Sequence, residues 1–376
     1  MNNELKIGLV GPGKMGRIHS QAYLTVPRFF NHRTHPVLSA ICGRNPDATA
    51  KAARDFGWAN VETDWRRLID RDDVDLVDIC TPNDLHADIA LAALAAGKHV
   101  VCEKPLAVDG PHARLMHDAA RDAGVQHLIV FNYRFVPAVR LAKELIDAGE
   151  LGEIYQYVGS FQQDWLSDPD VPVNWRLRSE RAGSGVLGDL GAHTIDLARY
   201  LVGEVDSVMG VLHTSVPTRP DGSGDRVRVD VDDSFESLVQ FGSGASGVVC
   251  ASRVATGQKT RNRFEVYGSA GAVQFDFGSM NELRFFNTAD DPRVRGFRSI
   301  STMHPGVHPW ASNWWGQGHH IGFEHTFAHV VDEVLSGLEE DRPLSPNFGD
   351  GLACQQVMDA IIRSSRAGAR ETVAGG

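Results

Sequence analysis

Residues 5–16 read LKIGLVGPGKMG, a short apolar run that ends in three closely spaced glycines. The run Leu5–Val10 is typical of a buried strand, and the glycines fall where the helical segment Lys14–Leu24 begins. In this GxGxxG context the first glycine permits a tight turn, the second lets a pyrophosphate approach the backbone, and the third lets the helix pack on the strand. The segment therefore predicts a dinucleotide site formed by Gly11, Gly13, Lys14, Met15 and Gly16.

The pattern of a strand followed by a helix repeats along the first third of the chain. Few charges fall within the apolar runs, which is typical of a parallel sheet covered on both faces. We therefore expect a doubly wound Rossmann domain over residues 1–131. The expected strands are Leu5–Val10, Val37–Cys42, Val74–Cys80, His99–Cys102 and His127–Phe131, and the expected helices are Lys14–Leu24, Pro46–Phe56, Ala87–Ala96 and Pro111–Ala123.

The pattern changes after residue 131. Runs that favour Val, Phe, Ser and Thr are separated by glycine-rich turns, which indicates a mostly antiparallel sheet with one buried face. We expect a second α/β domain over residues 132–376. The polar segment Thr218–Asp230 predicts an exposed loop, and two helices are expected late in the chain, at Glu324–Ser336 and Asp350–Ser365.

The composition argues against several classes of partner and site. The 376 residues include 48 acidic and 37 basic side chains, a net charge of −11, so we expect neither nucleic acid nor a membrane surface as a partner. The apolar run Ile89–Ala96 is far shorter than the ~20 residues that cross a bilayer. Met1–Lys6 shows no signal-peptide pattern. Five cysteines without a CxxC pair fit buried thiols in a reducing compartment, the alternative being a zinc or redox site. We expect a cytoplasmic protein without a bound metal.

The residues after the second strand bear on the choice of dinucleotide. An acidic residue there usually holds the ribose 2′-hydroxyl of NAD, whereas an arginine accommodates the 2′-phosphate of NADP. This chain has Gly43 followed by Arg44, and a guanidinium can pair with a phosphate through two hydrogen bonds. We expect NAD(P) as cofactor, with NADP favoured. The alternative is that Arg44 stacks on the adenine or points to water, and NAD is used.

Two further motifs carry polar side chains. Glu103 and Lys104 follow the strand His99–Cys102, and ligands of parallel sheets bind beyond such strand ends; a surface salt bridge between the two is the alternative. Asp189 and His193 are four residues apart in a glycine-rich segment, so they point the same way on a helical turn. The glycines would allow a substrate or nicotinamide close to the backbone. The alternative is a helix cap and a buried histidine.

Four motifs together resemble the Gfo/Idh/MocA family of glucose–fructose oxidoreductase and inositol dehydrogenase. They are GPGKMG at 11–16, TPNDLH at 81–86, EKPL at 103–106 and GDLGAHTID at 188–196. The resemblance spans nearly the whole chain, and it implies a Rossmann domain followed by an α/β domain with a large open, mostly antiparallel sheet. It also implies a nicotinamide-dependent enzyme that oxidises or reduces secondary alcohols of sugars and cyclitols. The favoured target is the C3 hydroxyl of a pyranose or anhydrosugar, and the expected assembly is a homodimer or homotetramer.

The resemblance assigns roles by position. Lys104 would hold the substrate oxygen, His193 would take the hydroxyl proton, and Asp189 would hydrogen-bond the substrate or orient the other two. Besides the glycine segment and Arg44, the cofactor would contact Thr81, Pro82, Asn83, His86, Glu103 and Lys104. The substrate would contact Tyr133, Trp165, Trp175, Arg176 and His325 in addition to the three catalytic residues. For each tryptophan the alternative is ordinary core.

Other functions remain open at this point. His325 and His329 share a four-residue spacing, yet no HExxH pattern or nearby cysteine supports a metal there. An inositol dehydrogenase and a glycosidase that oxidises its substrate transiently fit the same motifs. A non-catalytic dinucleotide sensor that binds a partner protein is the third alternative, but it has no need of Lys104, Asp189 and His193 together.

Overall fold

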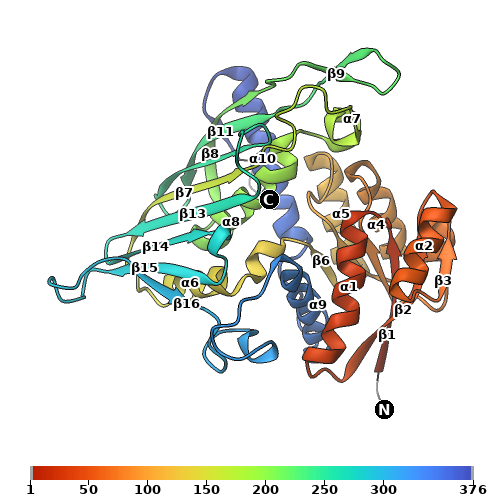
Figure 1. Ribbon diagram of the computed structural model, residues 1–376. Coiled ribbons are helices and arrows are strands. Elements are labelled where there is room, and N and C mark those ends of the chain that lie inside the picture. The colour runs from red at the N-terminus through yellow and green to blue at the C-terminus, as the bar shows by residue number, and fades with distance from the viewer. Residues whose placement is uncertain (1–2, 374–376) are drawn as a thin grey trace. The chain divides into compact units, whose positions relative to one another are not determined.

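The computed structural model describes residues 3–373, which form two compact units. Unit 1 comprises the chain up to Asn132 together with Gly322–Leu352, and unit 2 comprises Tyr133–Ile321 together with the chain from Ala353 (Figure 1). The predicted division into 1–131 and 132–376 differs from this arrangement, because Gly322–Leu352 returns to unit 1. Residues 1, 2 and 374–376, which the predicted ranges include, lie outside the described residues.

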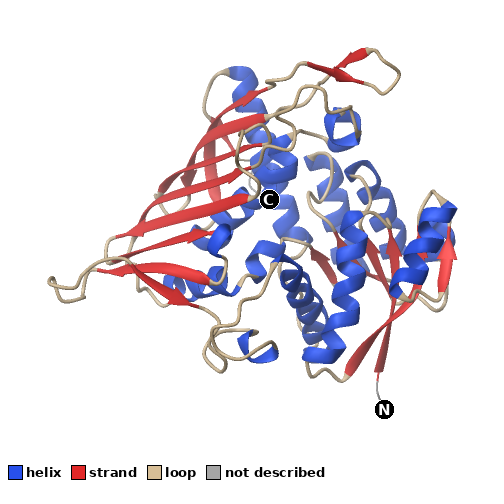
Figure 2. Ribbon diagram, in the orientation of Figure 1, coloured by secondary structure: helices blue, strands red, loops and turns tan. Residues whose placement is uncertain are grey.

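Unit 1 is built on a parallel sheet. Within residues 3–373 its strands are β1 (Asn3–Val10), β2 (Thr34–Cys42), β3 (Asn60–Glu62), β4 (Leu76–Ile79), β5 (His99–Cys102) and β6 (His127–Ile129). They follow the order β3-β2-β1-β4-β5-β6, with every neighbouring pair parallel. Ile7, Val77 and Val100 are fully buried, as expected of strands covered on both faces. The predicted Rossmann domain is confirmed (Figure 2).

Helices alternate with these strands as predicted, with one short helix, Trp65–Ile69, that the sequence analysis does not predict. They are α1 (Lys14–Phe29), α2 (Pro46–Phe56), α3 (Trp65–Ile69), α4 (His86–Ala95), α5 (Gly110–Ala123) and α9 (Phe323–Glu340), with the 3₁₀ turn η1 (Asn83–Leu85) before α4. Side chains cap several of them; Asn45 accepts the backbone N–H of Ala48 at the start of α2. Helix α9 packs on α1, where the ring of Phe327 lies 5.3 Å from that of His19. This contact explains why the late segment belongs to unit 1.

Unit 2 is built on a large sheet. Its strands in the described chain are β7 (Ile154–Gln162), β8 (Val205–His213), β11 (Ser234–Phe241), β12 (Ser246–Ser252), β13 (Arg261–Gly268), β14 (Gly271–Asp276), β15 (Glu282–Asn287), β16 (Arg298–Ser301) and β17 (Glu371–Thr372). They follow the order β16-β15-β14-β13-β7-β12-β11-β8-β17. Only β7 and β12 are parallel among these described neighbours. The predicted open, mostly antiparallel sheet is therefore confirmed.

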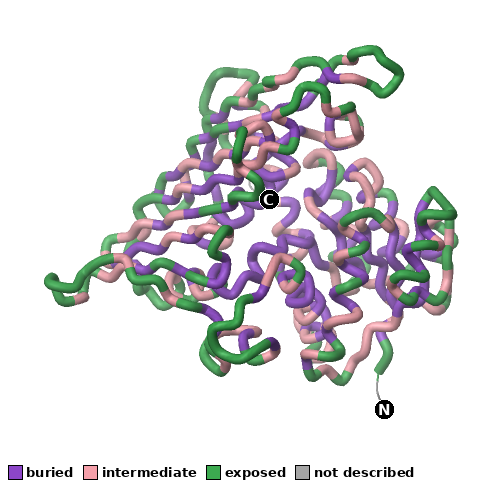
Figure 3. The backbone as a smooth tube through the Cα atoms, viewed as in Figure 1, coloured by how far each residue is buried: buried purple, intermediate pink, exposed green. Residues whose placement is uncertain are grey.

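One face of the large sheet packs against helices. Buried and exposed residues alternate along strands of this sheet (Figure 3). On β11, Phe235 and Val239 are buried and Leu238 is exposed. Helix α8 contacts β7 and β12, and α6 contacts β14 and β15. The helices and turns of unit 2 are α6 (Pro137–Asp147), α7 (Ser179–Ala182), α8 (Ala192–Val202) and most of α10 (Phe348–Ala367), with η2 (Asn132–Phe135), η3 (Trp175–Leu177), the π-helical turn η4 (Leu187–Gly191), η5 (Phe277–Ser279) and η6 (Ala311–Asn313).

The segment Thr218–Asp230 is largely exposed, as predicted, but it is not a plain loop. It contains a hairpin of β9 (Thr218–Pro220) and β10 (Arg226–Arg228). Arg219 is fully buried and donates to the backbone carbonyl oxygens of Leu166, at 2.5 Å, and Asp168, at 2.7 Å. Nothing in a polar run marks one arginine for burial, so the pattern alone indicates a loop. Across residues 3–373, no helix has both the length and the apolar character to cross a membrane.

Candidate functional site

The turn from β1 to α1 leaves space beside the start of the helix. Gly11 has φ +108°, and a Cβ there would lie 2.5 Å from the carbonyl oxygen of Cys80. A Cβ at Gly16 would lie 2.1 Å from the carbonyl oxygen of Gly11, so helix and turn meet closely. A Cβ at Gly13 would meet no described atom within 4 Å. The turn therefore offers an open cradle of backbone amides, with exposed Lys14 and half-buried Met15 beside it, and this fits a pyrophosphate.

The residue that directly follows β2 has no room for an acidic side chain. Gly43 is buried, and a Cβ there would lie 2.5 Å from the hydroxyl of Thr49 and 2.6 Å from the ring of Pro12. Arg44, the next residue, is exposed. Arg44 is therefore the first side chain after β2 that can reach toward a ribose. The preference for NADP over NAD stays a prediction.

The turns after β4 and β5 are tied together by His86. This residue is fully buried; its Nδ1 lies 3.0 Å from the carbonyl oxygen of Pro105 and its Nε2 lies 3.1 Å from that of Thr81. Burial lowers the pKa of His86, while the two carbonyl contacts act in the opposite direction. The geometry gives His86 a role in holding two turns, which differs from the predicted contact with the cofactor. The hydroxyl of Thr81 is buried and has no hydrogen-bond partner in the described chain, so a ligand could use it.

Glu103 binds groups that the sequence does not predict. It is buried, and its Oε2 accepts the backbone N–H of Lys104 at 3.2 Å. Its Oε1 lies 3.1 Å from Nε2 of His19, a residue of α1. These contacts differ from the alternative of a surface salt bridge from Glu103 to the Lys104 side chain. Sequence reasoning missed His19; its only signal is a polar residue on the buried face of α1, three positions after Gly16.

In unit 2, a buried carboxylate fixes the segment that carries Asp189 and His193. Asp232 accepts the N–H of Gly185 at 2.7 Å and that of Leu187 at 2.8 Å. A Cβ at Gly185 would lie 1.9 Å from the backbone oxygen of Asp232. The chain then enters the π-helical turn η4, a rare conformation that is frequent at functional sites. These bonds assign Asp232 a positioning role.

Two glycines of this segment, Gly185 and Gly191, contact protein. A Cβ at Gly191 would lie 2.6 Å from the ring of Phe235, just as one at Gly185 would meet Asp232. Sequence reasoning expected the segment to admit a substrate or nicotinamide close to the backbone. At these two positions the space is filled by the chain itself, because strand β11 and the residues before it pack there.

Aromatic and charged side chains gather around Asp189 and His193. The ring of Tyr133 meets the His193 imidazole edge to face, with centroids 4.7 Å apart. Nε of Arg176 lies 3.9 Å from Oδ2 of Asp189, and its guanidinium stacks 4.3 Å from the Trp175 ring. Burial raises the pKa of Tyr133, and the charge of Asp189 adds to this. Unit 2 thus brings together five of the predicted residues: Tyr133, Trp175, Arg176, Asp189 and His193. They include a candidate general base, a carboxylate and two aromatic rings.

Trp165 and His325 were also predicted to contact the substrate. Trp165 is 37% exposed in the loop after β7, where the Asp164 carboxylate pairs with Lys259 at 2.8 Å. His325 belongs to unit 1, at the start of α9, where its Nδ1 accepts the N–H of Gly322 at 3.0 Å. His329 is fully buried. Within residues 3–373, one group of potential metal ligands lies close together, His19, Asp78 and Cys80, and neither His325 nor His329 belongs to it.

Models of two protein domains match most of the chain. An oxidoreductase family with an NAD-binding Rossmann fold matches residues 5–131, and the GFO/IDH/MocA C-terminal domain matches residues 139–274. Levoglucosan dehydrogenase of Pseudarthrobacter phenanthrenivorans is 41% identical over 376 residues, covering 96% of each chain. Inositol 2-dehydrogenase of Rhizobium meliloti is 26% identical over 362 residues, again covering 96% of each chain. The segments Gln163–Leu166 and Asn174–Arg176 already suggest a likeness to levoglucosan dehydrogenase within the family.

Solved structures are similar along the whole chain. Levoglucosan dehydrogenase in complex with NADH and levoglucosan has a TM-score of 0.96 at 40% identity, covering 99% of this chain and all of that one. An oxidoreductase domain protein from Kribbella flavida has a TM-score of 0.97 at 44% identity, covering both chains completely. These matches confirm the prediction from the four motifs: the chain belongs to the Gfo/Idh/MocA family of oxidoreductases, with an NAD-binding Rossmann domain at its N-terminus.

Proposed function

We propose that this chain is an NAD(P)-dependent dehydrogenase that oxidises a secondary hydroxyl of a sugar, with C3 of levoglucosan or a related pyranose as the favoured target. One observation carries the proposal: the 41% identity to levoglucosan dehydrogenase extends over 96% of both chains. The gathering of Asp189, His193, Trp175 and Arg176 in unit 2 supports it. A stacked arginine–tryptophan pair offers both a flat apolar surface and hydrogen-bond donors, which suits a sugar ring.

The proposed chemistry divides between three side chains. A bound nicotinamide would supply the acceptor for the hydride. His193 would take the proton of the reacting hydroxyl at an imidazole nitrogen, as a general base. Lys104 would donate a hydrogen bond to the same oxygen and stabilise the negative charge that develops there. Asp189 would orient the substrate hydroxyl, and Arg176 would hold the Asp189 carboxylate in place.

The proposal is tested by following reduced nicotinamide with NAD and NADP in parallel. The panel contains levoglucosan, glucose, common glycosides and the inositols. Sustained reduction with levoglucosan or another pyranose is the expected result. Turnover with an inositol alone would instead favour an inositol dehydrogenase, as the similarity to inositol 2-dehydrogenase allows. A chain that binds NADH but turns over nothing in the panel would contradict the proposal and favour a redox glycosidase or a sensor.

The choice of dinucleotide depends on Arg44. If its guanidinium binds a 2′-phosphate, Arg44→Ala weakens NADP binding by about tenfold, and NAD binding changes little. The similar levoglucosan dehydrogenase structure holds NADH, which favours NAD for this chain. Fluorescence titration with NADH and NADPH separates the two cases. An unchanged ratio of the two affinities in Arg44→Ala would contradict the 2′-phosphate prediction.

We also propose a homo-oligomer that covers the open face of the large sheet. Met209 on β8 and Leu238 on β11 are opposite each other in register, and both are about half exposed. Val211 and Tyr155 add exposed apolar surface, at 62% and 55%. Apolar patches of this kind mark interfaces, and a second copy is the usual occupant. Leu238→Asp should shift the mass measured by light scattering to that of the monomer; an unchanged mass would contradict this assignment.

The compartment is proposed from the cysteines. All five lie in the described chain, and none of them forms a disulfide. Burial, with the charges of Asp64 and Glu62, raises the pKa of Cys42 to about 12, so this thiol stays protonated and inert. Unpaired thiols are typical of a reducing compartment, which supports the cytoplasm as the site of action.

A further inference from the structure

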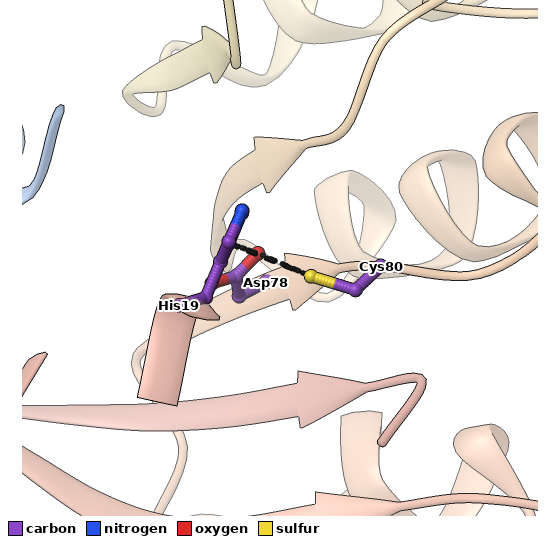
Figure 4. A group of neighbouring side chains, drawn as sticks. All are labelled: His19, Asp78 and Cys80. Atoms are coloured by element: carbon purple, nitrogen blue, oxygen red, sulfur yellow. Dashed lines mark hydrogen bonds and ion pairs between the residues drawn. The ribbon is translucent and has the colours of Figure 1, made fainter. Parts of the chain in front are cut away.

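A buried histidine lies between two carboxylates in unit 1. His19 is 4% exposed; its Nδ1 lies 2.9 and 3.0 Å from the two carboxylate oxygens of Asp78, and its Nε2 lies 3.1 Å from Oε1 of Glu103. Figure 4 shows the imidazole beside Asp78 on β4 and Cys80 just beyond that strand. Asp78 also accepts the hydroxyl of Tyr23 at 2.9 Å. Every polar atom of the imidazole is therefore directed at a carboxylate oxygen.

These contacts favour the protonated form of the His19 imidazole. A neutral imidazole carries one N–H, so its other nitrogen would direct a lone pair at a carboxylate oxygen. An imidazolium donates to both Asp78 and Glu103 and places one positive charge between two negative ones. Burial acts to lower the pKa of His19, yet the Asp78 charge and hydrogen bond outweigh it and raise that pKa well above its usual value.

The remaining titratable groups that face His19 keep their protons. Burial and the Asp78 charge raise the pKa of both the Tyr23 hydroxyl and the Cys80 thiol. The Cys80 sulfur lies 3.6 Å from Oδ1 of Asp78 and 3.4 Å from Nδ1 of His19. From helix α9, the neighbour is the uncharged ring of Phe327. Asp78 and Glu103 are thus the two charges that balance the imidazolium.

The cluster links the glycine turn of unit 1 to Lys104. His19 lies on α1, the helix that begins at that turn, and its partner Glu103 accepts the backbone N–H of Lys104 through the other carboxylate oxygen. We propose that His19 is a positioning residue: as an imidazolium bridging Asp78 and Glu103, it fixes the Glu103 carboxylate and, through it, the backbone of Lys104. The inference rests on the role of Lys104 in the proposed function.

A metal ion is the competing explanation. The ligand atoms of His19, Asp78 and Cys80 lie within 4.8 Å of one another, as they would around a metal. However, the distances are those of hydrogen bonds: Nδ1 of His19 lies 2.9 Å from Asp78, whose carboxylate also accepts the Tyr23 hydroxyl, and Nε2 of His19 faces Glu103, which lies outside this group. Hydrogen bonding therefore accounts for the whole cluster, and metal content becomes one arm of the test.

The kinetic test compares His19→Gln with a matched control. His19→Gln leaves one carboxylate without a donor, so we expect kcat to fall by about 30-fold, since small misplacements near the chemistry cost up to about 100-fold. KM for the sugar and the Kd for NADH should change by less than about threefold. His32→Gln removes a partly buried histidine, 2.9 Å from Asp332, and should leave kcat unchanged. Equal kcat for wild type and His19→Gln, or a loss matched by His32→Gln, overturns the inference while the proposed function stands.

Two measurements need no substrate, so they remain decisive if the proposed function fails. Nitrogen NMR of ¹⁵N-histidine protein, with His19 assigned from the variant, should show both ring nitrogens protonated at about pH 8, well above the ordinary pKa of ~6.5. A neutral ring at that pH overturns the inference. Elemental analysis of the wild type should show no stoichiometric zinc. About one zinc per chain that disappears in His19→Gln would also overturn it, and would assign a metal site instead.

Discussion

A methyl group added at Gly13 in unit 1 would meet no described atom within 4 Å, whereas one added at Gly185 in unit 2 would lie 1.9 Å from the Asp232 carbonyl oxygen. Both glycines belong to glycine-rich segments that precede a helix. In the first, the missing side chain leaves space for a ligand. In the second, it lets two parts of the chain touch, so that Asp232 can fix the turn before His193. A glycine-rich segment alone therefore does not distinguish a ligand cradle from an internal contact.

The largest expected effect is on kcat, and it should occur without a comparable change in NADH affinity. His193→Asn should lower kcat by about 10³-fold, because a general base contributes about 10² to 10⁴. NADH affinity should stay within about twofold, since the glycine turn of unit 1 is untouched. Steady-state kinetics and fluorescence titration give the two numbers. A kcat within tenfold of wild type would remove His193 from the proposed mechanism.

The next effect is on stability. Gly185→Ala places a methyl group against the Asp232 backbone, and we expect the free energy of unfolding to fall by about 3 kcal/mol, at the upper end for overpacking. Chemical denaturation measures it. Gly13→Ala is the matched control and should change the free energy of unfolding by less than about 0.5 kcal/mol. Similar losses in the two variants would break the comparison between the two segments.

The third effect falls on the cofactor. Gly13→Ala puts a methyl group into the open cradle, so NADH binding should weaken by about tenfold, or about 1.4 kcal/mol. Isothermal titration checks this, with Val294→Ala, a substitution of an 80% exposed residue, as a control for handling. Unchanged NADH affinity would mean that the pyrophosphate does not approach Gly13.

A fourth prediction concerns the pH dependence of stability, in a part of unit 1 away from its glycine turn. Burial, with the nearby His117, lowers the pKa of His127 to about 4, and its Nδ1 accepts the N–H of Phe348 at 3.1 Å. The unfolded chain, with a pKa near 6.5, therefore binds the extra proton first. Stability should fall by about 2 kcal/mol as the pH drops from about 6.5 to about 4.

His127→Asn is the control for this window. Asparagine can accept the same N–H through its side-chain oxygen but does not titrate. Its stability should therefore fall less steeply than that of the wild type between these pH values, as followed by thermal melts. Parallel pH profiles for the two proteins would exclude His127 as the cause.

The fold of unit 1 follows from its sequence because its signals are local. Parallel strands buried on both faces need continuous apolar runs, and helix α2 is bounded by Asn45 and Gly57, which mark its two ends. Strand β3, Asn60–Glu62, is absent from the prediction because three residues are too few to show a pattern. The return of Gly322–Leu352 to unit 1 depends on packing between α9 and α1, which no local signal reports.

The candidate site likewise has some features that a local sequence motif predicts and others that it does not. The glycine turn lies within six consecutive residues, so the spacing of Gly11, Gly13 and Gly16 alone predicts it. Asp232 and Gly185 are brought together by the fold from distant parts of the sequence, so no motif joins them. His86 illustrates a further limit: the motif marks its position, but only the structure shows that its nitrogens contact two backbone carbonyls.

The most direct test of the proposed dehydrogenase is the stoichiometry of cofactor and sugar. Wild-type protein is incubated with excess NAD and levoglucosan, and both reduced nicotinamide and remaining sugar are measured over many turnovers. The account predicts one NADH formed for each sugar oxidised, and the loss of both changes in Lys104→Ala. Consumption of sugar without net NADH would contradict it, since the cofactor would then cycle within the protein as in a redox glycosidase.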